Sequence, residues 1–429
     1  MKKAMIISVG VGKNVESAIY ASMKMNNPNF VVFVVSPDSK GTLDRPVQQY
    51  EHLRDICECK EFAINDPEDI DGVFRSCEKA LFFLFDKRFS ASEIVVDITS
   101  GTKVMSAAIA ALAILHKLYS ITYVGGGRRN GGGIVMQGTE KPKELKPLRI
   151  LYKHELYVIK HFFSKYQFYT CRLMIQDLVS RFKDLDKESE SINDIEKIIN
   201  GFISWERFDH EHALEFFEGV QHHDVKIQTE YLGKVKDDRK TEAAKHPSLK
   251  GKVPTKHLIV DIFQNARRRA EEGNFDDAVA RLYRCMEMVG QYALLQYGIV
   301  SSDVDLEKLQ GRITDTLFQK LEKHKDYSGR IKIGLVEDFE ILSELKKDDD
   351  TAIVYNKYRE DLKTYLNYRN ESILAHGIYP VKEEQYTKMS EIVYEIVKSA
   401  VSDVDEKLNE IKRCFESDVL STMLVPKGI

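Results

Sequence analysis

The sequence predicts an α/β domain followed by an all-α region, and three observations support this. In the first 147 residues, short apolar runs alternate with amphipathic segments, as in a parallel sheet flanked by helices. Residues 148–255 show helical patterns and little chemistry. From residue 256 onward, apolar residues recur at helical spacing almost to the end. We therefore expect a Rossmann-like domain (1–147), a helical connector (148–255), a helical bundle (256–416) and a tail (417–429).

The N-terminal domain is expected to alternate strands with helices. The expected strands are the apolar runs at residues 4–10, 30–36, 60–64, 93–98 and 121–124. The expected helices are the amphipathic stretches at residues 15–25, 47–57, 67–89 and 102–118. After a run of glycines, residues 134–137 are expected to form one arm of a hairpin that closes the sheet.

Three loops that follow strands are small, polar or cationic: residues 10–14, 99–103 and 125–130. Ligands of open parallel sheets bind beyond the carboxyl ends of the strands. Glycine-containing loops that run into a helix offer backbone N–H groups to an anion, and Lys103 and Arg128 add positive charge. The third glycine of a dinucleotide fingerprint and the first glycine of a P-loop are missing, so neither NAD binding nor ATP hydrolysis is indicated. For each loop taken alone, the alternative is that its glycines and polar residues only form a turn and bind no ligand.

The composition excludes several classes of protein. The chain has 429 residues, 43% hydrophobic content and a formal net charge of -4, which is enough apolar material for two or three domains. The near-balanced charge argues against nonspecific coating of nucleic acid, so we expect confined RNA contacts and no stable DNA binding. Six scattered cysteines suggest reduced thiols without a zinc ribbon. Because no apolar stretch approaches the length of a membrane span, a soluble cytoplasmic protein is expected.

Helices are expected through the rest of the chain. In the connector they lie at residues 151–166, 171–182, 192–202 and 213–220, and in the bundle at 258–272, 275–296, 306–324, 336–345, 352–376 and 385–414. His210, His212, His222 and His223 lack the spacing of a zincin helix and are predicted to be solvated or capping residues, not metal ligands. The lysine-rich stretch 234–256 predicts an exposed linker, with an electrostatic guide for RNA as the alternative.

One octet carries the clearest chemistry: Arg369-Asn370-Glu371-Ser372-Ile373-Leu374-Ala375-His376, followed by Gly377 and Pro380. In a helix, Arg369, Ser372 and His376 would share one face. Ile373 and Leu374 would then point toward a core, and His376 would lie in the last turn, where the helix dipole favours imidazolium. An arginine that grips a phosphate and a histidine that exchanges protons near neutral pH suffice for metal-free RNA cleavage. A surface pair with a helix cap is the alternative.

Three motifs resemble known families. The octet fits the R-x(4-6)-H pattern of HEPN ribonucleases, and the helix start Phe275-Asp276-Asp277-Ala278 is similar to HEPN bundles in CRISPR effectors. The stretch Val96-Asp97-Ile98-Thr99-Ser100-Gly101-Thr102-Lys103-Val104-Met105, which leads into an alanine-rich helix, resembles the strand-four signature of CARF sensor domains. The whole chain therefore resembles a CARF–HEPN ribonuclease of type III CRISPR systems, in the Csm/Csx effector group.

This resemblance implies a cyclic oligoadenylate, cyclic tetra- or hexa-adenylate, as allosteric activator, and no metal or other cofactor. The implied activator ligands are Ser8, Gly10, Val11, Thr99, Ser100, Gly101, Thr102, Lys103, Arg128 and Asn130. Arg369 and His376 are the implied catalytic residues, with Asn370 and Ser372 as secondary ligands.

A homodimer is also expected, since two copies of Arg369 and His376 would form one composite cleft. Single-stranded RNA would then be cleaved by 2'-hydroxyl attack to a 2',3'-cyclic phosphate. Two alternatives stay open: a sensor dimer whose HEPN bundle binds a partner or nucleic acid without cutting, and a CARF domain that also cleaves its own activator.

Overall fold

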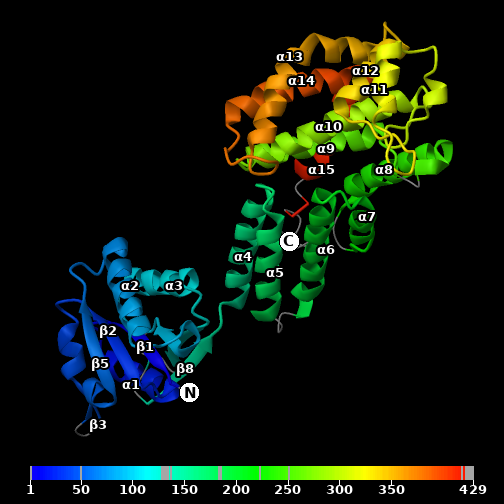
Figure 1. The fold of residues 1–429 in the computed structure, drawn as a ribbon. Helices are drawn as coiled ribbons and strands as arrows, with labels where there is room; N and C mark the ends of the chain where they lie inside the picture. Colours follow the sequence, from blue (N-terminus) through cyan, green and yellow to red (C-terminus); the bar gives the residue numbers. More distant parts are fainter. Residues whose placement is uncertain are drawn as a thin grey trace. The chain divides into compact units, whose positions relative to one another are not determined.

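The computed structural model describes residues 2–48, 51–126, 135, 138–181, 186–221, 224–249, 252–416 and 419–420. The chain forms two compact units, Met1–Glu155 and Leu156–Ile429 (Figure 1). The first is built on a sheet and the second on helices, as the sequence predicts.

The first unit contains a six-stranded sheet in the order β5-β2-β1-β6-β7-β8. Its strands are β1 (Ala4–Val9), β2 (Phe30–Val35), β5 (Glu58–Ala63), β6 (Ile94–Asp97), β7 (Ser120–Gly126) and β8 (Glu140–Leu145). The first five are parallel, and β8 runs antiparallel to β7. The five predicted strands are confirmed. The edge strand β8 was not predicted, and most of the expected hairpin arm at 134–137 lies outside the described residues.

Helices cover both faces of this sheet. On one face, Ala4 and Ile6 of β1 share a core with α2 (Ile70–Asp86) and α3 (Lys103–Leu115). The alternate residues of β1 face the opposite core, which α1 (Val15–Asn26) completes. Burial on both faces explains why the strands are nearly continuous apolar runs.

The predicted helix at residues 47–57 is wrong. The chain there forms the antiparallel pair β3 (Pro46–Gln48) and β4 (Glu51–His52), and then the 3-10 turn η2 (Leu53–Asp55). His52 is extended, and its backbone N–H donates to the Asp55 carboxylate at 3.1 Å, which starts a turn at this point. Two further 3-10 turns are η1 (Lys40–Asp44) and η3 (Ala91–Glu93).

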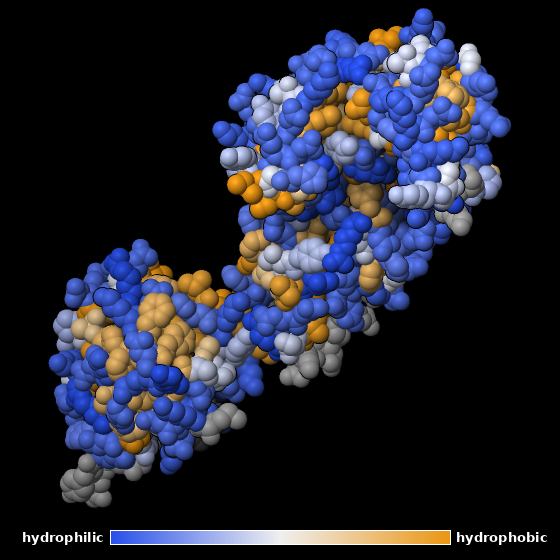
Figure 2. Space-filling model, viewed as in Figure 1, coloured by the Kyte–Doolittle hydropathy of each residue, from blue (hydrophilic) through white to orange (hydrophobic). Residues whose placement is uncertain are grey.

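The first unit exposes apolar side chains over α2 and α3. Figure 2 shows hydrophobic residues gathered there. Phe82 of α2 is 47% exposed and Leu115 of α3 is 56% exposed. Exposed apolar patches of this kind commonly mark contact surfaces.

The second unit is helical. Its elements are α4 (Leu148–Phe163), which begins in the first unit, α5 (Phe168–Arg181), α6 (Asp186–Glu206), α7 (His210–Glu218), α8 (Lys226–Lys245), η4 (Pro247–Leu249), α9 (Lys256–Glu271), α10 (Phe275–Leu295), η5 (Leu306–Lys308), α11 (Asp315–Glu322), α12 (Leu335–Leu345), α13 (Asp350–Glu371), α14 (Glu383–Ala400) and α15 (Val404–Glu416). The central helix α10 packs against α9, α12, α13 and α14.

Four predictions for the helical region need correction. The first half of the expected linker at 234–256 belongs instead to the helix α8, which continues to Lys245 and buries Val235 despite its many lysines. The expected helix at 306–324 is interrupted at Gly311, which adopts a left-handed φ of 70°. The expected helix at 385–414 breaks at the buried, extended Val401. The helix expected to include His376 ends at Glu371.

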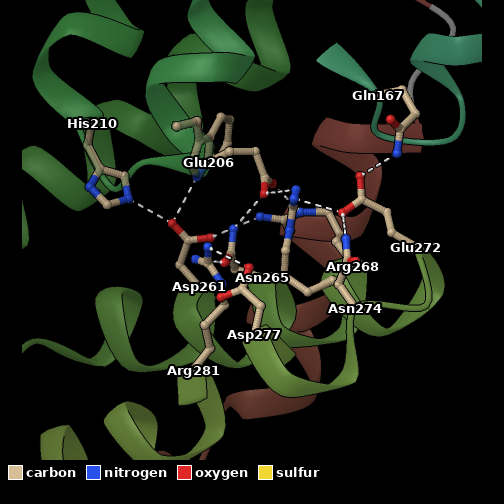
Figure 3. A network of polar contacts seen from close by, with 12 residues as sticks. Gln167, Glu206, His210, Asp261, Asn265, Arg268, Glu272, Asn274, Asp277 and Arg281 are labelled. Atoms are coloured by element: carbon tan, nitrogen blue, oxygen red, sulfur yellow. Dashed lines mark hydrogen bonds and ion pairs between the residues drawn. The ribbon is translucent and has the colours of Figure 1, made fainter. Parts of the chain in front are cut away.

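A buried ion cluster joins α6 and α7 to α9 (Figure 3). We use this name for Glu206, His210, Asp261 and Arg268, whose side chains are all at most 7% exposed. Asp261 accepts hydrogen bonds from the Trp205 indole at 2.8 Å and from His210 Nε2 at 2.7 Å. His210 is therefore a buried partner of a carboxylate, and the prediction of a solvated or capping histidine is wrong for it.

Glu206 holds the other half of the cluster. It accepts hydrogen bonds from Asn265 at 2.9 Å, from Arg268 Nε at 2.6 Å and from Arg269 at 2.5 Å. The Arg268 guanidinium lies 3.6 Å from the centroid of the Phe415 ring. Charges buried this deeply are tolerated only when they are paired, so the cluster fixes α6 and α7 on α9.

None of the helices in the described part of the chain combines the length and apolarity needed to cross a bilayer. Among the same residues, no group of three or more His, Cys, Asp and Glu side chains is arranged to hold a metal ion.

Candidate functional site

A cavity of about 300 Å³ lies at the carboxyl ends of β1 and β6. Six of the predicted activator ligands line it: Gly10, Val11, Thr99, Ser100, Gly101 and Thr102. A neighbouring cavity of about 170 Å³ shares Thr99 and Ser100 and adds Lys13 and Asn14. The structure thus brings two loops together at the sheet edge where ligands of this fold class bind: the loop after β1 (residues 10–14, here called the first loop) and the loop after β6 (residues 99–103, here called the fourth loop).

Two glycines allow these loops to meet. A Cβ atom on Gly10 would lie 2.7 Å from the backbone nitrogen of Gly101, closer than real contacts allow. Gly101 itself has a φ of 94°, in the left-handed region that favours glycine. A side chain at either position would therefore push the loops apart.

A pair of serines locks the two loops. The hydroxyl of Ser8 donates to the backbone carbonyl of Ser100 at 2.5 Å, and the hydroxyl of Ser100 donates to the carbonyl of Ser8. Ser8 is only 1% exposed and is not part of the cavity lining. Its place in the structure is therefore that of a positioning residue beneath the cavity.

Asp97, at the end of β6, supports the fourth loop from below. Its buried carboxylate accepts from the Ser22 hydroxyl and from the backbone N–H of Thr99, the latter at 2.8 Å. Burial raises the pKa of Asp97, and these hydrogen bonds oppose the shift. The Thr99 hydroxyl in turn accepts from the Val124 N–H at 2.9 Å, which ties the loop to β7.

Thr102 forms the N-cap of α3. Its hydroxyl accepts from the Met105 N–H at 3.2 Å and donates to the Pro67 carbonyl at 2.9 Å. Lys103 follows as the exposed first residue of α3. The predicted ligands Arg128 and Asn130 lie outside the described residues.

Two residues of this region were missed by sequence reasoning. Arg45 donates to the backbone carbonyl of Gly12 at 2.8 Å and forms an ion pair with Glu16 at 3.2 Å, so it braces the first loop. Asp38 lines the cavity and offers an acceptor, which suits a ribose hydroxyl or a base amino group better than a phosphate. Because β2 and the turn after it carry no motif, the sequence contains no signal for either residue.

In the helical unit, the octet does not form one continuous helix. The helix α13 ends at Glu371, and Ser372 is its buried, extended C-cap. The next residues fold back, since the N–H of His376 donates to the Asn370 carbonyl at 3.1 Å and the N–H of Tyr379 donates to the Glu371 carbonyl at 3.1 Å. The shared helix face of Arg369, Ser372 and His376 is therefore not formed, but backbone bonds return His376 to the end of the helix.

Gly377 makes this fold-back possible. A Cβ atom at Gly377 would lie 1.8 Å from the carbonyl oxygen of Glu371, so no side chain fits there. Further along, the Val381 N–H meets both carboxylate oxygens of Asp276 at 3.3 Å, which fastens the segment to the start of α10. The resemblance singled out Asp276 by its motif, and the structure adds this contact.

Arg369 lies against the central helix. Its guanidinium stands 4.7 Å from the centroid of the Tyr283 ring on α10, and one terminal nitrogen donates to the Asn370 side chain at 3.1 Å. Burial raises the pKa of Tyr283, so its ring remains a neutral platform for the cation. Ser372 is 2% exposed, whereas Asn370 and His376 are exposed. Tyr283 was missed because it is far from the octet in sequence.

The segment beside His376 exposes large apolar side chains. Ile373, Leu374, Ile378 and Tyr379 are 69%, 56%, 79% and 67% exposed. The expectation that Ile373 and Leu374 face a core is wrong, since the fold-back turns them outward. Hydrophobic atoms are visible at this end of the bundle in Figure 2.

Comparison with known proteins places these features in a family. The family model of the Csm6 6H domain matches residues 151–245, and that of the Csm6 HEPN domain matches residues 249–400. The structure is similar to that of Enterococcus italicus Csm6 bound to cyclic hexa-2'-fluoro-hexa-dAMP, with a TM-score of 0.53 and 13% sequence identity over 97% of this chain and 100% of that chain. No protein with a curated description matches the sequence.

The chain has a sensor-like α/β unit with a cavity at the carboxyl ends of its strands, followed by a HEPN bundle that carries Arg369 and His376. These features define the class of CARF–HEPN effectors of type III CRISPR systems. The two matched models together span more than half of the 429 residues. The chain belongs to the Csm6 family.

Proposed function

We propose that this chain is a cyclic-oligoadenylate-activated endoribonuclease that cleaves single-stranded RNA without a metal in type III CRISPR defence. The observation that carries the proposal is the end of α13, where Arg369 rests on Tyr283 and backbone bonds return the exposed His376 to the same helix end. This arrangement lies within the segment that matches the HEPN model.

The chemistry needs only these groups and the substrate. Arg369 holds the scissile phosphate and offsets the negative charge that builds on it. The ribose 2'-oxygen attacks phosphorus while its proton passes to a base, the bond to the 5'-oxygen breaks, and that oxygen takes up a proton. His376 assists these proton transfers, and the products are a 2',3'-cyclic phosphate and a 5'-hydroxyl. In this proposal Asn370 orients Arg369, which is supported by the hydrogen bond between their side chains, and the buried Ser372 shapes the turn instead of contacting RNA.

The proposed active form is a homodimer. Each chain contributes one copy of Arg369 and His376, and two copies would provide both an acid and a base for the two proton transfers. The exposed apolar side chains Ile373, Leu374 and Ile378 beside His376 support contact with a second copy at this surface.

The proposed activator site is the cavity between the first and fourth loops. The related Enterococcus italicus Csm6 was solved with cyclic hexa-2'-fluoro-hexa-dAMP, and we propose a cyclic oligoadenylate for this chain. Gly10 and Gly101 let backbone N–H groups approach a phosphate, and Asp38 accepts from a hydroxyl or an amino group. Binding of the activator would shift the conformational equilibrium of the protein toward the state that cleaves RNA. Cleavage of the activator by the sensor itself, through Thr99 and Lys103, stays a separate hypothesis.

The test is cleavage of a fluorogenic single-stranded RNA in EDTA, without activator and with cyclic tri-, tetra- and hexa-adenylate. We expect stimulation by one ring size in the wild type and its loss in His376→Ala and Arg369→Ala. Binding of the activator to both variants, measured by calorimetry, serves as the control for an intact sensor. Full activity in His376→Ala, or no cleavage despite activator binding, would refute the ribonuclease mechanism and favour a bundle that binds partners.

A further inference from the structure

The HEPN part of the chain contains a large cavity whose lining does not include Arg369 or His376. Its volume is about 660 Å³, and its walls come from α10, from the segments after α10 and from the residues that precede α9. This is more than twice the volume of the sensor cavity of about 300 Å³. The proposed reaction uses none of its lining residues.

The cavity is strongly cationic. Its lining includes Lys252, Arg284, Lys308, Arg330 and Lys332, against the single carboxylate Asp303. The chain as a whole carries a formal charge of -4, so this group concentrates positive charge on an otherwise slightly acidic protein. We call these five residues the basic cluster. Such a concentration attracts polyanions.

Three members of the basic cluster form no close ion pair with a described residue. Arg284 pairs with Glu287 at 3.0 Å, and Lys308 donates to the Gly298 carbonyl at 3.1 Å. Lys252, Arg330 and Lys332 are all exposed, and no carboxylate of a described residue lies within ion-pair distance of them. Lys332 interacts at longer range with the exposed Asp326 carboxylate and helps to lower its pKa. These three charges are therefore available to an external anion.

The basic cluster adjoins the proposed cleavage site. Arg284 directly follows Tyr283, the residue on which Arg369 rests, so the two sites occupy neighbouring faces of α10. From Arg284 the cavity continues past Gln291 to Leu295, about 16 Å along the helix axis. A strand whose phosphate is held by Arg369 could therefore continue along this wall.

The lining chemistry favours nucleic acid over a protein partner. The cavity contains no aromatic side chain among its lining residues, whereas the buried centres of protein interfaces are enriched in aromatics. Instead it offers lysine and arginine beside the hydroxyls of Ser301 and Ser302 and the amide of Gln291, all of which bind phosphate or sugar oxygens.

We propose that the basic cluster is a phosphate-binding subsite that holds single-stranded RNA to one side of the scissile bond. This inference rests on the proposed ribonuclease function and adds the path of the substrate. The subsite contributes to RNA affinity and not to the chemical step, because its residues are separate from Arg369 and His376.

The test compares two triple variants of the full-length protein. Lys252→Ala/Arg330→Ala/Lys332→Ala removes the three unpaired charges of the basic cluster. The matched control Lys226→Ala/Lys234→Ala/Lys412→Ala removes three exposed lysines of α8 and α15 that are paired with Glu230, Glu410 and Glu416. RNA binding is measured in a His376→Ala background with activator present, at several salt concentrations, and cleavage is measured without that background change.

We expect the cluster variant to bind RNA about 10- to 100-fold more weakly at low salt. Its plot of log affinity against log salt concentration should become shallower by about 2, because three phosphate contacts are lost and each contributes about 0.7 to the slope for a single strand. Cleavage should show a raised KM at unchanged kcat for a long RNA, and wild-type values for a dinucleotide. The charge-preserving variant Lys252→Arg/Arg330→Lys/Lys332→Arg should bind like the wild type, as should the control.

The subsite proposal would be refuted if the cluster variant bound RNA with the affinity and salt dependence of the wild type. If the wild type still cleaved RNA, the proposed ribonuclease function would be unaffected. An equal effect of the control variant would also overturn the subsite proposal, since loss of net charge would then suffice. A wild-type chain that neither binds nor cleaves RNA with any activator would instead overturn the proposed function on which the subsite depends.

Discussion

Replacing Glu206 with glutamine tests how much the buried ion cluster stabilises the helical unit. The Glu206 side chain is 7% exposed and accepts hydrogen bonds from Asn265, Arg268 and Arg269. Without its charge, the buried Arg268 keeps Asp261, at 3.9 Å, as its one ionic partner among the described residues. Leaving one partner of a buried pair uncompensated costs about 3–5 kcal/mol. Glutamine preserves the volume and one acceptor oxygen, so we expect about 3 kcal/mol.

The chain contains a built-in reporter for this measurement. Trp205 is the single tryptophan, it is fully buried, and its indole N–H donates to Asp261 of the cluster. Urea unfolding followed by tryptophan fluorescence therefore reports on the helical unit, while the α/β unit contributes no tryptophan signal. The expected loss corresponds to a fall in Tm of about 10 °C for a unit of this size.

The matched control is Glu230→Gln, which removes an exposed carboxylate paired with Lys226 on α8. Surface pairs of this kind contribute at most about 0.5 kcal/mol. A loss below about 1 kcal/mol in Glu206→Gln, or the same loss in both variants, would refute the reasoning that the cluster holds α6 and α7 on α9.

Three further variants test the two sites and one buried carboxylate. Gly377→Ala should reduce activated RNA cleavage by about 100-fold, because a Cβ 1.8 Å from the Glu371 carbonyl displaces the turn that carries His376. Gly233→Ala, which meets open space on α8, is the control, and equal activity of the two variants would contradict the prediction. Gly10→Ala should weaken activator binding in calorimetry by at least about 10-fold, because it forces the first loop away from Gly101, and unchanged affinity would rule this out. Burial raises the pKa of Asp338 to about 7 from an ordinary value near 3.8, so the folded state loses up to about 4 kcal/mol of stability as pH rises through this interval. Asp338→Asn, which stays neutral, should therefore gain Tm over the wild type increasingly from about pH 4 to about pH 7 and level off above that, and a gain independent of pH would exclude this cause.

Patterns that depend on local burial were readable from the sequence. The five parallel strands are apolar on both faces because helices cover both, and the loops that follow β1 and β6 carry glycines because their backbones meet. The lining of the sensor cavity was predicted residue by residue for Gly10, Val11 and 99–102. The edge strand β8 escaped notice because it is largely polar and has one paired neighbour.

Features that depend on contacts between distant residues were decided by the tertiary structure. The second half of α8 looks like a linker because charged residues outnumber apolar ones there, yet the helix buries Tyr231, Leu232 and Val235 along one stripe. His210 looks like a solvated residue until Asp261, 51 residues later, reaches it. Neither pairing leaves a periodic signal in the sequence.

The candidate cleavage site combines both kinds of information. By itself, the sequence determined the chemical groups, Arg369 and His376, and their link to the HEPN pattern. Only the tertiary structure decided that α13 ends between them, that Tyr283 supports the arginine and that Ile373 and Leu374 face outward. The physical reason is that helix periodicity describes one segment alone. The end of this helix is fixed by the absence of a side chain at Gly377 and by the contact of Val381 with Asp276 at the start of another helix.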